Sequence, residues 1–237
     1  MGRLPFGEKG QTEFRRIWNS AEPLAAEARK SSNMKSMTLS GRVGTVRISG
    51  SPGSITDQGI RLVTYGRLTG PRLIRAWICH LFFNALAPDS VNTTTRITGL
   101  GEPNGSPVAT LEFCPVKDQA EPLLAPLAEL ALEARLRPVC LFPKTAWAFA
   151  RVLAKNEFDT GSRSMARAMA DYSVRQAWLG RRIGSQIIPG EAHDRYNALV
   201  IQGHDPFDSI NALVESGFVS HTLLVCRPLL AHMAAHP

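Results

Sequence analysis

The chain has 237 residues, of which 44% are hydrophobic and 20% charged, so it can bury a sizeable core and global disorder is excluded. Its 19 glycines and 16 prolines are near average proportions, which excludes collagen-like and low-complexity classes. The net charge is +7, and most of the 27 cations are arginine. This balance favours a polyanionic partner, although a genomic preference for arginine over lysine explains it equally well.

The sequence contains no signal for export or for membrane insertion. The N-terminus lacks the apolar stretch of a signal peptide, and the longest apolar segment, 76–87, is too short to span a bilayer. Within that segment His80 is predicted to be a hydrogen-bonded core residue rather than a ligand. The four cysteines are far apart in apolar runs and are predicted to be reduced core thiols of a cytoplasmic protein. We expect no membrane contact, metal or cofactor.

The first 35 residues are predicted to form a helical lead-in that ends in a polar linker. Two mixed-charge segments, 11–18 and 22–30, have helical character and are separated by Pro23. We therefore divide the chain into this lead-in, 1–35, and a main domain, 36–237.

A strand–loop–strand–helix unit begins the main domain. Apolar residues alternate with polar ones over 38–48, and a second strand is predicted over 60–65. The loop between them is rich in glycine, serine and proline, which suggests an antiparallel hairpin. Pro71 suits the first turn of a largely buried helix over 71–87.

The remaining elements indicate an α+β class, with a small mixed β-sheet flanked by helices and a helical C-terminal extension. Strands are predicted over 94–99 and 108–113, a short strand or buried connector over 138–143, and helices over 120–136, 146–155, 162–179, 206–215 and 219–235.

The unit over 38–87 is similar to the core of PD-(D/E)xK nucleases. There, one strand carries a metal-binding acid and the next an Asp/Glu-x-Lys, because paired carboxylates hold the metal ions that activate water. This chain has Gly44 at the position of the first acid, Thr64 at that of the second, and Gly66 at that of the lysine. The pattern suggests a nuclease-like fold with a degenerate active site, although an ordinary hairpin and helix explain this segment equally well.

An ordered series of weak motifs covers about nine-tenths of the chain. They lie at 2–10, 39–43, 59–65, 72–81, 122–132, 141–147 and 194–196, and at the final Leu229-Leu230. Through them the chain resembles the C-terminal region of RecC, the gamma subunit of exodeoxyribonuclease V (RecBCD). Members of that family are several times longer, so the resemblance implies that this chain corresponds to the C-terminal piece only.

The resemblance implies a nuclease-like domain without catalytic residues. RecC joins two helicase-bearing subunits, holds DNA, helps to split the duplex and reads the recombination hotspot. The implied partners are therefore DNA and RecB-like and RecD-like subunits, in double-strand break repair and recombination. The resemblance also implies that this chain alone has no enzymatic activity and no cofactor, and that it forms part of an ATP-dependent exodeoxyribonuclease.

Two groups of residues are candidates for binding. Five arginines on or just after the helix predicted over 162–179 are expected to contact DNA phosphates: Arg163, Arg167, Arg175, Arg181 and Arg182. Three apolar residues of the lead-in lie in a stretch too short and polar to build a core, and are expected to bind a partner subunit or pack loosely: Phe14, Ile17 and Trp18.

Two other functions fit the sequence. One is an active magnesium-dependent nuclease that uses displaced acids, for which the candidates are Glu102, Glu112 and Asp118. The other is a small basic DNA-binding protein of unrelated ancestry. The chain has no phosphate-binding Gly-x-x-x-x-Gly-Lys-Ser/Thr loop and no Gly-x-Ser-x-Gly nucleophile motif.

Overall fold

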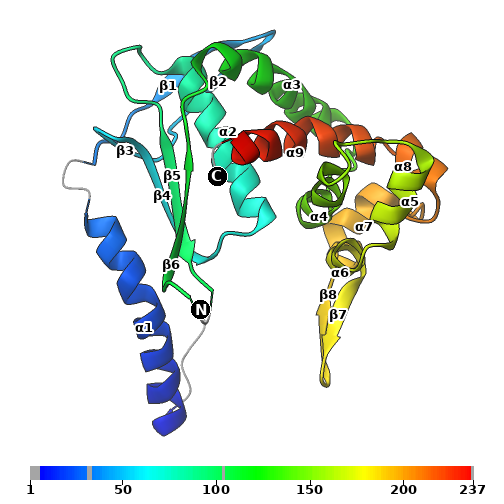
Figure 1. The fold of residues 1–237 in the computed structure, drawn as a ribbon, viewed down its shortest axis with the longest axis horizontal. Coiled ribbons are helices and arrows are strands. Elements are labelled where there is room, and N and C mark those ends of the chain that lie inside the picture. The colour runs from blue at the N-terminus through cyan, green and yellow to red at the C-terminus, as the bar shows by residue number, and fades with distance from the viewer. Residues whose placement is uncertain (1–5, 31–33, 103–104, 236–237) are drawn as a thin grey trace.

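The fold is α+β, as predicted, with a small mixed sheet and several helices (Figure 1). The computed structural model describes residues 6–30, 34–102 and 105–235. Its helices are α1 (Glu8–Arg29), α2 (Gly70–Leu86), α3 (Lys117–Leu136), α4 (Pro143–Ala154), α5 (Ser162–Ala170), α6 (Tyr172–Leu179), α7 (Arg195–Ile201), α8 (Ile210–Glu215) and α9 (Phe218–Ala235), with a 3-10 turn η1 (Glu191–His193). Its strands are β1 (Leu39–Val43), β2 (Val46–Gly50), β3 (Ser54–Thr56), β4 (Gly59–Arg67), β5 (Thr95–Leu100), β6 (Val108–Phe113), β7 (Gly180–Ile183) and β8 (Gln186–Pro189). Among the described residues, none of the helices combines the length and the hydrophobicity that a membrane span requires.

Four strands form the main sheet in the order β3-β4-β5-β6. β4 and β5 run parallel, whereas β3 and β6 pair antiparallel at the two edges. A parallel pair needs a long crossover, and α2 supplies it between β4 and β5. The strands predicted over 94–99 and 108–113 are confirmed as β5 and β6.

The predicted hairpin between segments 38–48 and 60–65 is wrong. Gly44, with a φ of 55°, forms a tight turn with Thr45, so the first segment folds back on itself as the two-stranded β1–β2 sheet. β4, which contains the second segment, pairs with β3 and β5 instead. Apolar residues continue on both sides of the turn, and their pattern alone therefore predicts a single strand.

α1 is one continuous helix rather than the two predicted. Pro23 lies within it, and proline lacks the N–H that would complete the helical hydrogen-bond ladder at that position. Only Gly10 and Leu24 are buried, so most of the helix surface is exposed. Residues 31–33 of the predicted linker lie outside the described residues, and Lys35 forms an isolated β-bridge with Ile55.

α1 and α2 lie on opposite sides of the main sheet (Figure 1). Side chains alternate along β4, so Ile60 is buried with Phe83 of α2, whereas the neighbouring Arg61 reaches the last turn of α1. α2 is largely buried, as predicted, and its Trp77 and Leu81 are almost fully enclosed.

A buried polar network joins α2 to β5 and to the start of α3. His80 Nδ1 lies 3.0 Å from Thr95 Oγ1. Asn84 Nδ2 donates to the carbonyl of Thr93 at 2.9 Å, and Asn84 Oδ1 accepts from the N–H of Val116 at 2.9 Å. Burial lowers the pKa of His80 to about 3, so the ring is neutral. The prediction that His80 is a hydrogen-bonded core residue is confirmed.

The helical half, which extends from α4 to α9, departs from the predictions in three places. The helix predicted over 162–179 is divided at Asp171, whose backbone is extended and whose carboxylate caps α6. The β7–β8 hairpin and α7 are not among the predicted elements. The helix predicted over 206–215 begins only at Ile210, because Ser209 is its N-cap.

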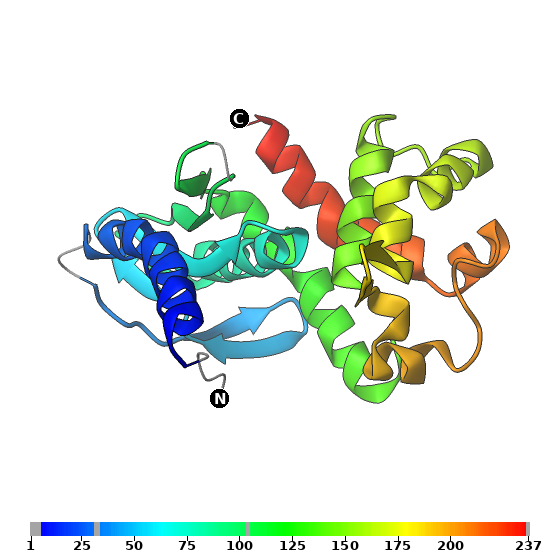
Figure 2. The same cartoon turned by 90° about the horizontal axis from the view of Figure 1, so that it is seen from below.

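A single core links the two halves. α9 packs against α2, α3, α4 and α8, and it crosses from the helical half towards the sheet (Figures 1 and 2). The main core cluster draws residues from each of these helices, including Leu81 of α2, Phe149 of α4 and Leu229 of α9. Segment 138–143 is a connector whose Phe142 is buried in the same cluster. The four cysteines are free; Cys226 is buried and the others are partly buried.

Candidate nucleic-acid interface

The three positions compared with nuclease catalytic residues do not lie on one sheet. Gly44 is exposed in the β1–β2 turn, where its N–H donates to the Glu121 carboxylate of α3 at 3.3 Å. Thr64 and Gly66 belong to β4 of the main sheet. No hydrogen bonds pair β1 or β2 with β4. The structure therefore does not bring Gly44 into the sheet that carries the other two positions.

The space beside Gly66 is occupied by Arg72. A Cβ atom built at Gly66 would lie 2.5 Å from Arg72 Nη1, which itself donates to the carbonyl of Arg67 at 2.6 Å. The φ of Gly66 is 146°, a conformation that side chains rarely adopt. A lysine at this position would therefore require both the backbone and Arg72 to move.

The displaced acids do not converge. Glu112 Oε2 accepts from Arg96 Nη2 at 2.7 Å, and Glu102 forms an ion pair with Arg67 at 3.4 Å. Asp118 is exposed in the first turn of α3. Among the residues that the structure describes, no three His, Cys, Asp or Glu side chains are grouped so that they could hold a metal ion.

The five candidate arginines are exposed but belong to three elements. Arg163 and Arg167 lie on α5, and Arg175 lies on α6 beside a hollow that contains Trp178 and Phe207. Arg181 and Arg182 are neighbours on β7, so their side chains point to opposite faces of the hairpin. Their role in DNA binding stays a prediction.

A groove of about 600 Å³ lies between the connection that precedes α2, one face of α4, one face of α6 and the β7–β8 hairpin. We call it the α4 groove. Trp147 of α4 is half-buried on its wall and packs so closely on Gly70 that the glycine has no room for a Cβ atom. Of the five candidate arginines, only Arg181 lines this groove.

Four cations line the α4 groove: Lys144, Arg151, Lys155 and Arg181. The first three are spaced at i, i+7 and i+11, with Lys155 as the C-cap residue of α4, so they lie along one face of this helix over about 16 Å. Within the described residues, none of the four takes part in an ion pair. These three cations are not among the predicted binding residues, although their helical spacing could have indicated them.

One acid lines the same groove, and its carboxylate is already engaged. Asp171 accepts from the N–H of Ser173 at 2.9 Å as the N-cap of α6. The hydrogen bond from the Ser173 side chain lowers the pKa of Asp171, and the charge of Lys155 lowers it further. The groove surface is therefore strongly basic.

Glu191 holds the N-terminus of α4, where Lys144 enters the groove. Glu191 is 9% exposed, and its carboxylate accepts from the N–H groups of Lys144 and Thr145 at 3.0 and 2.8 Å, and from the Thr145 hydroxyl at 2.8 Å. A carboxylate here also complements the helix dipole. Glu191 is separated from the end of the β7–β8 hairpin only by Gly190, so one residue couples the two walls of the groove.

A protein-family model described as the RecC C-terminal domain matches residues 1–154. The chain belongs to the RecC C-terminal domain family. The match ends at the last residue of α4, so it includes the sheet, α1 to α4, and Lys144 and Arg151 of the groove. The later motifs of the resemblance, including 194–196, lie outside the matched residues. No curated protein matches the chain.

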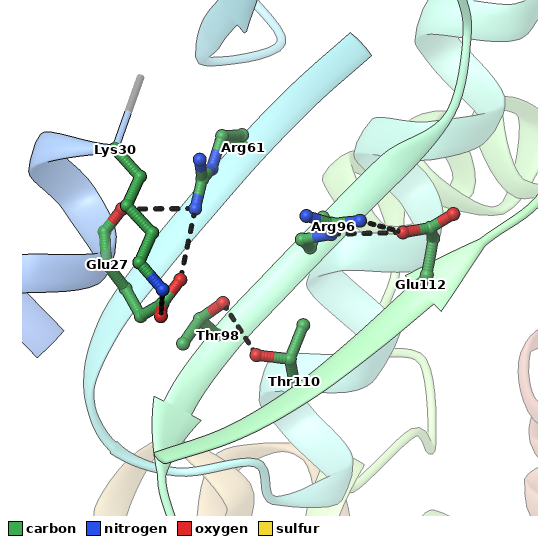
Figure 3. A network of polar contacts seen from close by, with 7 residues as sticks. All are labelled: Glu27, Lys30, Arg61, Arg96, Thr98, Thr110 and Glu112. Carbon is green, nitrogen blue, oxygen red and sulfur yellow. Dashed lines mark hydrogen bonds and ion pairs between the residues drawn. The ribbon is translucent and has the colours of Figure 1, made fainter. Parts of the chain in front are cut away.

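In this RecC-family chain, polar contacts hold the end of α1 on the sheet (Figure 3). Arg61 Nη2 donates to the carbonyl of Glu27 at 3.1 Å and lies 3.5 Å from its carboxylate. The hydrogen bond from Lys30 lowers the pKa of Glu27, and the charges of Lys30, Arg61 and Arg96 lower it further. The same sheet face carries the Arg96–Glu112 pair.

The aromatic residues of α1 are exposed rather than enclosed. Phe14 and Trp18 are 52% and 57% exposed, Ile17 is 36% exposed, and the two rings stack with centroids 6.0 Å apart. The stretch that holds these three residues contributes nothing to the buried core. The RecC-family chain therefore presents an exposed apolar stripe on α1.

Proposed function

We propose that this chain is a non-catalytic DNA-handling and subunit-assembly domain of a RecBCD-type helicase–nuclease that acts in double-strand break repair and recombination. Membership in the RecC C-terminal domain family carries the proposal, because it points to a subunit of the exodeoxyribonuclease V complex. RecB-like and RecD-like subunits and DNA are the proposed partners, and the cytoplasm the proposed location. The division at residue 35 stays a prediction.

The proposed absence of catalysis rests on the chemistry of three positions. Metal ions in nuclease sites are held by carboxylate oxygens, and neither glycine nor threonine supplies one. Gly44, Thr64 and Gly66 provide no such group, and Arg72 lies where a side chain of residue 66 would project. We propose that the β4–α2 unit derives from a PD-(D/E)xK nuclease fold that has lost its active site.

The purified protein is expected not to hydrolyse linear single-stranded or duplex DNA in the presence of Mg²⁺ or Mn²⁺. The test is a gel assay of end-labelled DNA over a range of protein concentrations, with a variant that removes two displaced acids, Glu112→Gln with Asp118→Asn, as the matched control. Metal-dependent degradation that persists through purification and disappears in this variant would show that the chain is a nuclease.

Two surfaces support the two parts of the proposed role. The exposed arginines of α5, α6 and β7 support non-sequence-specific contact with phosphates, which is expected to weaken as salt rises. The stripe formed by Phe14, Ile17 and Trp18 supports docking of a partner subunit, because exposed aromatic residues are typical of interfaces. The alternative of a small basic DNA-binding protein of unrelated ancestry is wrong, because the chain belongs to the RecC C-terminal domain family.

A further inference from the structure

We infer that the α4 groove binds a single nucleic-acid strand through its phosphate backbone. The inference rests on the proposed DNA-handling role and assigns it to a site. Three of the four groove cations, Lys144, Arg151 and Lys155, lie outside the arginine set predicted from the sequence.

The charge of the groove selects a polyanion. Its four cations face one acid, Asp171, whose carboxylate is used to cap α6. The cations are exposed, and within the described residues they make no ion pairs that a ligand would have to break. Each phosphate that such a cation neutralises releases condensed counterions, which drives binding at low salt.

The geometry favours one strand over a duplex. The three cations span about 16 Å along the helix, so they can contact consecutive phosphates of one strand. A groove of about 600 Å³ has the size of a pocket for a drug-sized ligand, so it takes nucleotides rather than a double helix.

The groove also offers an aromatic surface, which distinguishes a nucleic acid from an acidic peptide. Trp147 lines the wall between the levels of Lys144 and Arg151. Single-strand-binding proteins combine a basic groove with aromatic rings on which bases stack. An acidic peptide would match the charge but gains no comparable stacking.

The walls of the groove are rigidly attached to the fold. Glu191 links the N-terminus of α4 to the segment that follows the hairpin, and the contact between Gly70 and Trp147 fixes α4 against the start of α2. A strand can therefore bind without first ordering the site, which limits the entropy cost of binding.

The test is fluorescence anisotropy with a labelled oligothymidylate across a salt series. The variant Lys144→Gln, Arg151→Gln, Lys155→Gln removes three groove charges, and the control Arg42→Gln, Arg47→Gln, Arg75→Gln removes three exposed charges elsewhere. With about 0.7 counterions released per contact, the wild type should lose about 20-fold more affinity between 50 and 200 mM salt than the groove variant. The control should retain the wild-type salt dependence.

The outcomes separate the groove from the proposed function. If the wild type binds the oligonucleotide and the two triple variants weaken this binding equally, the assignment of the site to the α4 groove is wrong. The proposed DNA-handling role would still stand. No binding at low salt would overturn both. Tighter binding of a duplex of the same length would contradict the single-strand assignment, and displacement of the oligonucleotide by polyglutamate at equal charge concentration would assign the groove to an acidic chain instead.

A second measurement uses only the wild-type protein. The chain has few lysines, so acetylation of each can be followed by mass spectrometry. Bound oligothymidylate should protect Lys144 and Lys155 severalfold, whereas Lys9 and Lys117, which lie away from the groove, should react as in the free protein. Equal reactivity of Lys144 and Lys155 with and without the strand would overturn the inference.

Discussion

The free energy of unfolding is expected to fall by about 2 kcal/mol between about pH 6.5 and about pH 4.5, because of one buried histidine. His80 is fully buried, and burial is the main cause that lowers its pKa from 6.5 to about 3; the nearby His232 lowers it further. The unfolded chain binds a proton at this position below about pH 6.5, whereas the folded chain does not until about pH 3. Acidification in this interval therefore favours the unfolded state.

The contribution of His80 can be separated from that of the carboxylates. The carboxylates whose pKa is lowered, such as Glu27 and Asp171, lose their stabilising contribution as the pH falls through lower values, below their ordinary range near 4. The measurement is urea unfolding at several pH values for the wild type and for His80→Gln, whose amide can still bond to Thr95. The wild type should show the decline and the variant should be nearly flat. Parallel profiles would show that His80 is not the cause.

Substituting Glu191 is expected to cost about 3 kcal/mol of stability for Glu191→Ala and about half of that for Glu191→Gln. In the alanine variant the N–H groups of Lys144 and Thr145 lose their acceptor in a largely buried setting, and unpaired buried donors are costly. Glutamine keeps one acceptor oxygen but no charge to complement the dipole of α4.

The free energy of unfolding of both Glu191 variants can be measured by chemical denaturation. Glu215→Ala is a suitable control because Glu215 is exposed on α8 and makes no hydrogen bond or ion pair through its side chain among the described residues. Its effect should stay within about 0.5 kcal/mol. A loss for Glu191→Ala as small as that of the control would mean that this carboxylate does not fix α4 to the segment after the hairpin.

Elements with strong local signals could be predicted from the sequence. Helix α2 carries a continuous apolar pattern behind a proline at its start, and β5 and β6 are compact alternating segments. The pairing of the strands is determined by tertiary contacts and could not be predicted in the same way. A single glycine is the only sequence signal for the turn at Gly44. The apolar pattern therefore predicts an unbroken strand over 38–48 and pairs it wrongly with the segment 60–65.

For the α4 groove, too, the sequence indicates the local pattern but not which distant segments come together. The spacing of Lys144, Arg151 and Lys155 is visible in the sequence as one helix face. The opposite wall comes from β7–β8, and the carboxylate that fixes α4 comes from Glu191, more than forty residues further along the chain. No local pattern indicates that these segments meet.

The most direct test of the proposed role is co-purification of the tagged chain with the RecB-like subunit encoded in the same genome. The wild type is expected to form a complex, and Phe14→Ser with Trp18→Ser should weaken it at least tenfold without loss of stability, because both side chains are more than half exposed. Leu136→Ser with Tyr172→Ser, two exposed apolar residues elsewhere, should bind as the wild type does. Failure of the folded wild-type chain to bind the RecB-like subunit would contradict an assembly role, and equal binding by all three proteins would contradict docking through α1.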